Sequence, residues 1–226
     1  MTYRAELEDL LIAAQIEERF IAPLAQYGAL VLESNRQFNL TGAKSAAEFA
    51  PHLVDSLTIA PYVEGSLVDV GSGAGLPAIP IAIATGIPVT MIETTLKKAR
   101  FLSGVLDELE LQGGVVAERA EVAGHEPRLR EQFRSGTARA VATAPTVAEL
   151  LLPLIAPGGV AVLQRGIIDP HERAALADAA LVLGGVLEEE ISLDGDRRIM
   201  LVRKTSATQG RFPRRTGVPE KRPLCM

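Results

Sequence analysis

The sequence predicts an α/β fold in which a seven-stranded, mostly parallel sheet follows a helical extension. From residue 65 onward, short apolar runs alternate with segments whose apolar residues recur at helical spacing. The first of these runs ends in a cluster of glycines, as the first strand of a doubly wound sheet does. Residues 1–62 show helical spacing and no strand pattern. Together these features indicate a Rossmann-like domain with helices on both faces of its sheet.

The helical extension is expected to contain three helices. Residues 7–14 and 20–31 carry apolar side chains at helical spacing. Ser45 and Glu48 have the form of a capping box, in which Glu48 reaches back to the start of the helix. This third helix should end near Pro61.

The apolar runs beyond the extension predict strands, and the amphipathic segments between them predict helices. We expect strands at residues 67–70, 89–92, 115–117, 139–142 and 160–163. We expect helices at residues 77–85, 96–109, 121–133, 146–156 and 170–183. A closing antiparallel pair is expected at residues 186–193 and 199–203. The chain thus divides into a helical extension (1–62), an α/β domain (63–208) and a basic tail (209–226) that is expected to be extended after Gly210.

Composition excludes several classes of protein. The 226 residues, 47% of them hydrophobic, suffice for one domain with its own core. One cysteine, Cys225, and three scattered histidines exclude a disulfide scaffold and a four-cysteine metal site within the chain, so we expect no metal. Apolar stretches stay shorter than the roughly 18 residues of a membrane span, and the acidic start does not resemble a secretory signal. We expect a monomer in the cytoplasm.

The net charge of −5 is unevenly distributed along the chain. Residues 211–226 contain five basic residues and one glutamate, a net of +4, which leaves −9 for the first 210 residues. A basic tail on an acidic body is typical of arms that bind polyanions. A solvated, frayed terminus has the same composition, so composition alone leaves both interpretations open.

A glycine-rich turn after the first expected strand predicts a ligand site. Asp69 stands two residues before Gly71, and Gly73 and Gly75 follow at two-residue intervals. Glycines there permit positive φ and let a ligand approach the backbone, while the following helix points its amide groups at the ligand. A dinucleotide turn requires G-x-G-x-x-G/A, and counting from Gly71 places Leu76 at the last position, which fails. Counting from Gly73 gives only a weak match. The observed spacing fits the turn of a methyl-donor site, and we call residues 71–75 the donor turn.

A second acidic residue, Glu93, closes the second expected strand, 22 residues after Gly71. A carboxylate at that place can accept hydrogen bonds from both ribose hydroxyls of an adenosine. Dinucleotides and S-adenosylmethionine both contain this ribose, so Glu93 does not distinguish them. The glycine spacing together with Asp69 and Glu93 favours S-adenosylmethionine over a dinucleotide and over an ordinary turn without a ligand.

Several further segments are more particular than the glycine turn, among them Asn-Leu-Thr, His-x-x-Asp-Ser-Leu and a C-terminal Pro-Arg-Arg. With the turn, they lie at residues 35–41, 52–57, 69–77, 93–102, 119–121, 138–142, 157–159 and 213–224. On these segments the chain resembles the RsmG (GidB) family, class I methyltransferases of bacteria that modify a guanine N7 in the 530 loop of 16S rRNA. The chain departs from the family pattern at Ser34, Ala78 and Arg134, where Trp, Gly and Asp are usual, and at residues 163–166, where the family has Leu-Lys-Gly.

The resemblance implies a role for individual residues. The glycine turn would hold the methionine and ribose parts of S-adenosylmethionine, Glu93 the ribose hydroxyls, and Ala120 and Glu121 the adenine. Arg139 would line both the donor and the substrate parts of the pocket, and with Asp55 it is our candidate for the chemistry of the pocket. The cofactor-binding residues expected in this way are Asp69, Gly71, Ser72, Gly73, Gly75, Leu76, Glu93, Thr94, Thr95, Ala120, Glu121 and Arg139.

The resemblance also implies an RNA partner, either naked 16S rRNA or a precursor of the small ribosomal subunit. RNA binding requires cationic side chains that face phosphates. Our candidates lie on the helix beside the donor turn, after the fifth strand and in the tail: Lys97, Lys98, Arg100, Arg165, Arg214, Arg215, Lys221 and Arg222. For the three residues on the helix, a solvated face is the alternative interpretation.

The expected reaction needs no general base, because guanine N7 has an in-plane lone pair and no proton to remove. The enzyme has to hold N7 in line with the sulfonium methyl group, about 3–3.5 Å away. Two other functions are compatible with the donor turn: methylation of a small molecule or a protein, and nucleotide binding without catalysis. The basic tail and the particular segments count against a small molecule or a protein as the substrate.

Overall fold

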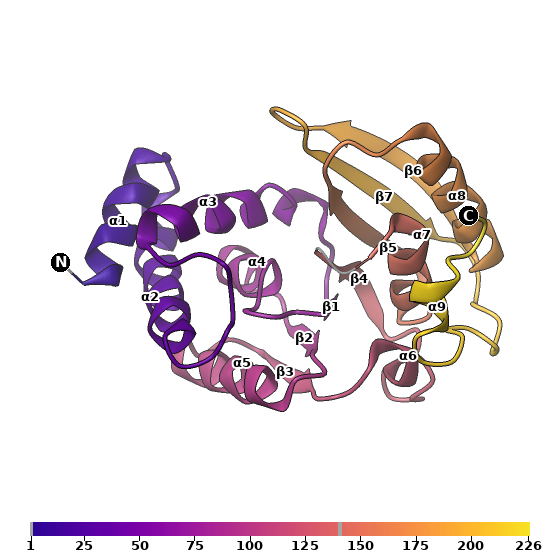
Figure 1. Cartoon of the computed structure of the whole chain (residues 1–226), viewed down its shortest axis with the longest axis horizontal. Helices are drawn as coiled ribbons and strands as arrows, with labels where there is room; N and C mark the ends of the chain where they lie inside the picture. Colours follow the sequence, from indigo (N-terminus) through magenta and orange to yellow (C-terminus); the bar gives the residue numbers. More distant parts are fainter. Residues whose placement is uncertain (1, 140–141) are drawn as a thin grey trace.

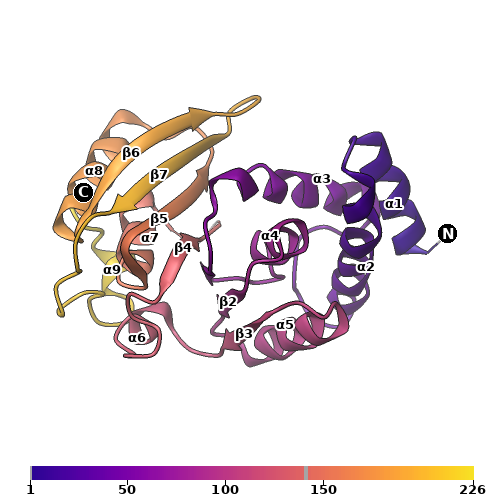
Figure 2. The same ribbon diagram turned by 180° about the vertical axis from the view of Figure 1, so that it is seen from behind.

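The computed structural model describes residues 2–139 and 142–226, and in them seven strands form one sheet. Their order is β3-β2-β1-β4-β5-β7-β6 (Figures 1 and 2). The first five strands are parallel, and β7 pairs antiparallel with both β5 and β6. The strands are β1 (Leu67–Val70), β2 (Val89–Ile92), β3 (Gly113–Val116), β4 (Phe133–Thr137), β5 (Ile155–Arg165), β6 (Gly185–Ser192) and β7 (Arg198–Lys204). The expected mostly parallel sheet with an antiparallel end is confirmed.

The helices cover both faces of the sheet and precede its first strand. They are α1 (Tyr3–Ala13), α2 (Glu18–Asn35), α3 (Ala46–Leu57), the 3-10 turn η1 (Ala60–Tyr62), α4 (Ala78–Thr85), α5 (Leu96–Glu108), α6 (Ala120–Ala123), α7 (Ala144–Leu151), α8 (Pro170–Val182) and α9 (Val218–Lys221). None of the helices in the described residues combines the length and the apolar character that a membrane crossing requires.

Each face of the sheet has its own hydrophobic core, because successive side chains of a strand point to opposite faces. On β1, Leu67 joins the core formed with α1–α5, whereas Val68 and Val70 join the core formed with α6–α8. All four β1 residues are buried, as expected for a central strand of a parallel sheet. The carboxyl ends of β1, β2 and β4 therefore meet at one edge of the molecule, where a doubly wound sheet binds its ligands.

Helices α2 and α3 pack on α4 and so stand beside the donor turn, and α1 packs on both of them (Figure 1). The side chain of Ser45 accepts a hydrogen bond from the Glu48 N–H at 3.2 Å and caps α3, as expected. Glu48 reaches back to the N–H of Lys44, one residue before the cap, at 2.8 Å. Earlier in the extension, the buried Tyr27 of α2 donates its hydroxyl to the Ala74 carbonyl of the donor turn at 2.9 Å.

Four expected elements were placed or shaped wrongly. The fourth strand is β4, before the expected 139–142; of that range, residues 140 and 141 lie outside the described residues. Its sequence, Phe-Arg-Ser-Gly-Thr, is hardly apolar. The strand can nevertheless be buried, because the hydroxyls of Ser135 and Thr137 form hydrogen bonds with polar groups of neighbouring segments. The helix expected at 121–133 is only α6, and the helix expected at 146–156 is α7, which ends before β5 begins at Ile155. The tail contains α9 and folds back onto the domain instead of extending (Figure 1).

Candidate functional site

The donor turn is shaped by glycines that no other residue can replace without strain. Gly71 and Gly75 have φ values of 70° and 103°, in the left-handed region that disfavours side chains. A Cβ on Gly75 would lie 2.7 Å from Ile79 Cγ1 and 3.0 Å from Leu102 Cδ2, so α4 and α5 close around this glycine. The turn at Gly71 is exposed, which leaves its backbone accessible to a ligand.

Glu93 is fixed by the turn on one side and by the start of α5 on the other. Its Oε2 accepts a hydrogen bond from the Gly73 N–H at 2.9 Å, and its Oε1 accepts one from the Thr95 N–H at 2.7 Å. Each carboxylate oxygen can accept a further hydrogen bond. Glu93 is thus oriented by backbone amides and retains the capacity to accept the two hydroxyls of a ribose.

Asp69 is a buried carboxylate that is only partly satisfied. Its Oδ1 accepts a hydrogen bond from the Thr137 hydroxyl at 2.9 Å, while its Oδ2 has no partner among the described residues. Burial is the main reason why the pKa of Asp69 is raised to about 7, and the positive charge of Arg139 opposes part of that rise. A buried, unpaired carboxylate oxygen below the donor turn suits a ligand that carries positive charge, as S-adenosylmethionine does.

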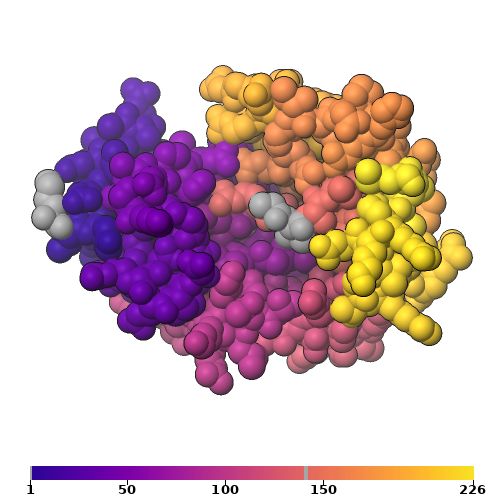
Figure 3. Space-filling model, in the orientation of Figure 1, coloured from indigo at the N-terminus to yellow at the C-terminus, as the bar shows by residue number. Residues whose placement is uncertain are grey.

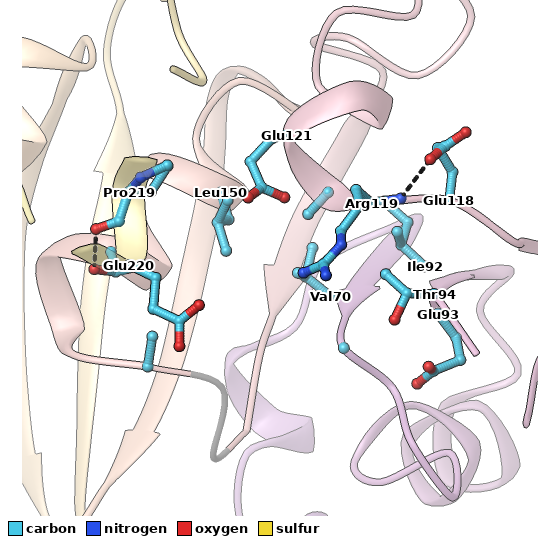
Figure 4. Close-up of a pocket in the computed structure, with 14 residues that line it drawn as sticks. Val70, Ile92, Glu93, Thr94, Glu118, Arg119, Glu121, Leu150, Pro219 and Glu220 are labelled. Carbon is cyan, nitrogen blue, oxygen red and sulfur yellow. Dashed lines mark hydrogen bonds between the residues drawn. The ribbon is translucent and has the colours of Figure 1, made fainter. Parts of the chain in front are cut away.

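A cavity of about 180 Å³ opens beside the donor turn. It brings together five of the expected donor residues, which are Gly71, Glu93, Thr94, Ala120 and Glu121. Four carboxylates and one guanidinium line it, so the cavity is acidic; they belong to Glu93, Glu118, Glu121, Glu220 and Arg119. Figure 4 shows Pro219 and Glu220 of α9 across the cavity from Glu93 and Thr94. We name this space the donor cavity.

The C-terminal tail forms one wall of the donor cavity. The Thr146 hydroxyl of α7 donates to the Pro219 carbonyl at 3.0 Å, and the Gly217 N–H donates to Glu121 Oε1 at 2.8 Å. On the neighbouring stretch, the Arg214 guanidinium donates to both oxygens of Glu149, whose side chain is fully buried. Local sequence gave no signal for this wall, because the partners of the tail lie 65 to 96 residues away.

The other expected donor residues lie around the donor cavity and do not line it. The Ser72 hydroxyl donates to the Asp69 carbonyl at 3.0 Å, which stiffens the turn. Gly75 and Leu76 are buried beneath the turn, and Gly73 and Thr95 supply the amides that hold Glu93. Their roles in donor binding stay predictions.

A second cavity, of about 320 Å³, contains both residues expected to carry the chemistry of the pocket. Arg139 lies 3.6 Å from Asp55, and Arg197, which the sequence did not indicate, lies 2.6 Å from the same carboxylate. We name this space the arginine cavity; it is lined by Asp55, Arg139, Gln164, Arg165, Gly166, Ile167 and Arg197. Burial, followed by the charge of Arg139, lowers the pKa of the nearby His52, so its ring is neutral near pH 7.

The structure separates the expected RNA-binding residues into exposed and paired groups. Lys97 and Arg100 on α5, and Arg215, Lys221 and Arg222 in the tail, are exposed, and Lys98 is half-buried. Arg165 and Arg214 are instead held by carboxylates, those of Glu172 at 2.8 Å and Glu149 at 2.6 Å. On the face in Figure 3, the N-terminal helices and the C-terminal tail stand on opposite sides of a hollow.

Solved structures with the same fold define the class. A geranyl diphosphate C-methyltransferase from Streptomyces coelicolor, solved with S-adenosyl-L-homocysteine, has a TM-score of 0.58 at 12% identity and covers 70% of this chain and 82% of its own. A 1,6-didemethyltoxoflavin-N1-methyltransferase from Burkholderia thailandensis has a TM-score of 0.56 at 13% identity, with coverages of 80% and 90%. The fold is that of a class I S-adenosylmethionine-dependent methyltransferase.

Sequence relatives identify the family within this class. The model of the GidB family, described as rRNA small subunit methyltransferase G, matches residues 21–200. Proteins named ribosomal RNA small subunit methyltransferase G include one from Deinococcus deserti, 39% identical over 96% of both chains, and one from Pelotomaculum thermopropionicum, 39% identical over 92% of both. The chain belongs to the GidB family of methyltransferases, and its methyl donor is S-adenosylmethionine.

Proposed function

We propose that this chain transfers the methyl group of S-adenosylmethionine to N7 of a guanine in the 530 loop of 16S rRNA, in the cytoplasm. The observation that carries the proposal is the acidic donor cavity, in which Glu93 is oriented by the donor turn in a chain of the GidB family. Membership of that family supports the small-subunit rRNA as the substrate, and the exposed basic residues of α5 and the tail support a nucleic-acid partner.

The donor supplies an electrophilic methyl group on a sulfonium, and the chain supplies position and charge. Glu93 would accept the ribose hydroxyls, and the adenine would lie beside Ala120 and Glu121, which line the donor cavity together with Pro219. The carboxylates of the cavity favour a donor that carries positive charge. As the N7–methyl bond forms, the sulfur–methyl bond breaks and the positive charge moves to the purine ring. Since N7 has no proton, none of these residues has to act as a base.

The arginine cavity lies on the substrate side of this arrangement. The carboxylate of Asp55 is paired with Arg139 and Arg197, so its role is to position these two guanidinium groups beside the substrate. Arg139 lines the arginine cavity, and its positive charge lowers the pKa of both Asp69 on β1 and His52 on α3.

Deletion of the gene, followed by mapping of 7-methylguanosine in 16S rRNA by cleavage at that base, tests the proposal. We expect the modification to disappear and to return when the wild-type gene is supplied. A Glu93→Ala variant should not restore it, whereas Glu118→Gln, an exposed residue of the same cavity, should restore it. Persistence of the modification in the deletion strain would refute the assignment.

A further inference from the structure

The arginine cavity carries a charge that a cationic methyl donor does not explain. Three of its seven lining residues are arginines. Arg165 is balanced by Glu172, at 2.8 Å. Arg139 and Arg197 share one carboxylate, that of Asp55, at 3.6 Å and 2.6 Å. Among the described residues, one positive charge of this cavity therefore has no matching carboxylate.

An unpaired polar atom lies in the same lining. Gln164 is only 8% exposed, and its amide group donates to the Asp55 carbonyl at 3.1 Å and to the Thr58 hydroxyl at 3.3 Å. Its Oε1 is buried and accepts no hydrogen bond from the described residues. Buried acceptors are normally paired, so this atom indicates a ligand that donates a hydroxyl or an N–H group.

The two cavities adjoin. Ala142 lines the donor cavity, and its carbonyl accepts a hydrogen bond from the Arg165 guanidinium of the arginine cavity at 2.6 Å. A ligand in the arginine cavity therefore lies beside the donor. The volume of about 320 Å³ falls within the range of roughly 300–1,000 Å³ that is usual for small-molecule sites.

We propose that the arginine cavity binds the nucleotide whose base is methylated, and that Arg197 binds its phosphate. This inference rests on the proposed function, since it assigns the substrate part of the same site. A nucleotide meets both requirements: its phosphate is a two-pronged acceptor for guanidinium groups, and its hydroxyls and base N–H groups can donate to Gln164. Asp55 holds Arg139 and Arg197 in position before the phosphate arrives.

Arg197 belongs to the turn between β6 and β7, and this hairpin thereby becomes a substrate-recognition element. A matched control is Arg173 on α8, which is half-exposed and pairs with Glu190 of β6 at 2.7 Å, outside the cavity. Arg197→Ala removes the proposed phosphate contact. Arg197→Lys keeps the charge but loses the two-pronged geometry.

The experiment compares guanosine 5′-monophosphate with guanosine as ligands, each titrated by NMR into the chain saturated with S-adenosylhomocysteine. We expect the wild type and Arg173→Ala to bind the monophosphate at least about 10-fold more tightly than the nucleoside. Arg197→Ala should retain less than about a 3-fold preference, and Arg197→Lys an intermediate one. A wild type without preference, or an Arg197→Ala variant that keeps it, overturns the proposal. Should Arg197→Ala fail to fold, an undiminished preference in Arg197→Lys overturns it instead.

Two further measurements separate this proposal from the proposed function. Affinity for S-adenosylmethionine should be equal in wild type and Arg197→Ala; an equal loss of donor and monophosphate binding would assign Arg197 a purely structural role. Methylation of 16S rRNA by the wild type tests the function itself. If the wild type prefers the monophosphate but does not methylate rRNA, the proposed function is wrong and the assignment of the arginine cavity stands. If it methylates rRNA but has no such preference, the assignment of the cavity is wrong and the proposed function stands.

Discussion

The two cavities of this chain have opposite charges although they share a boundary at Ala142 and Arg165. Four of the five charged side chains that line the donor cavity are carboxylates, whereas three of the four in the arginine cavity are guanidinium groups. A cationic nucleoside and an anionic nucleic acid can thus lie side by side without competing for the same surface. The difference shows that acidic and basic side chains are separated between the two cavities. The net charge of −5 for the whole chain does not reveal this separation.

The cavities also differ in how the chain builds them. The donor cavity combines the ends of β1 and β2 with α6 and closes with the C-terminal α9, which is tied down by Glu121, Thr146 and Glu149. The arginine cavity combines α3, the end of β5 and the β6–β7 hairpin, which meet through Asp55 and Arg197. In the described part of the chain, only the donor cavity has a wall formed by the C-terminal tail.

Arg214→Ala should have the largest effect. It leaves the fully buried Glu149 carboxylate without its cation, and breaking a buried pair in this way costs about 3–5 kcal/mol in the free energy of unfolding. It also releases α9, so donor affinity should fall with stability. Arg215→Ala, at an exposed neighbour, should change the stability by less than about 0.5 kcal/mol. Urea denaturation measures both, and equal stabilities of the two variants would show that the tail is not a wall.

Glu93→Gln should lower the affinity for S-adenosylmethionine by about 100-fold. A neutral amide is a weaker acceptor for ribose hydroxyls, and hydrogen bonds to charged groups are worth about 1.5–3 kcal/mol each. Calorimetric titration measures the change. Glu118→Gln is the matched control, because Glu118 lines the same cavity but is exposed. If the two variants lose the same affinity, the donor cavity attracts its ligand through its overall negative charge, and Glu93 makes no specific contact with the ribose.

Donor affinity should rise with pH through the titration of Asp69. Burial raises the pKa of this carboxyl from 3.8 to about 7, so it is mostly neutral at pH 6 and mostly ionised at pH 8. A cationic donor prefers the ionised form, and the affinity should therefore increase by up to about 10-fold over this range. Asp69→Asn should remove the part of this rise in affinity that comes from Asp69. Any pH dependence that comes from titration of the donor itself should remain. An identical pH profile in the variant would detach Asp69 from donor binding.

Tyr27→Phe should have the smallest effect and tests the support beneath the turn. The variant loses the hydrogen bond to the Ala74 carbonyl inside the core, at a cost of about 1 kcal/mol in the free energy of unfolding. Donor affinity should fall a few-fold because the turn is less firmly held, while the preference for guanosine 5′-monophosphate over guanosine is unchanged. Thermal denaturation and titration with both ligands test this; a loss confined to the arginine cavity would reverse the assignment.

Sequence patterns predicted what depends on nearby residues. The strand at residues 89–92, the Ser45 cap and the glycine turn at Gly71 all have local causes, namely apolar runs, side-chain capping and backbone freedom. The donor cavity could be foreseen in its Gly71 and Glu93 half for the same reason. Asp55 and Arg139 were expected at the pocket only from the resemblance, and their ion pair was not predicted, since no spacing rule connects them.

The remaining features depend on contacts between distant segments. The local composition of the tail, which is rich in Pro and Arg, predicts an extended segment. In the structure, hydrogen bonds to Glu149 and Glu121 hold the tail against the domain. Arg197 follows an ordinary hairpin turn, and only the antiparallel pairing of β6 with β7 carries it to Asp55, 142 residues earlier. The apolar pattern did not predict strand β4, because Ser135 and Thr137 make its sequence polar. These hydroxyls are buried in the structure, where they donate hydrogen bonds to the Glu64 carbonyl and the Asp69 carboxylate.

The division of labour between the two cavities can be tested in one crystal structure of the chain with S-adenosylhomocysteine and guanosine 5′-monophosphate. We predict the adenosine of the first ligand between Glu93 and Pro219, with its ribose hydroxyls on the Glu93 carboxylate. We predict the phosphate of the second ligand within hydrogen-bond distance of Arg197. A donor product bound among the arginines, or a phosphate distant from both Arg139 and Arg197, would contradict the account.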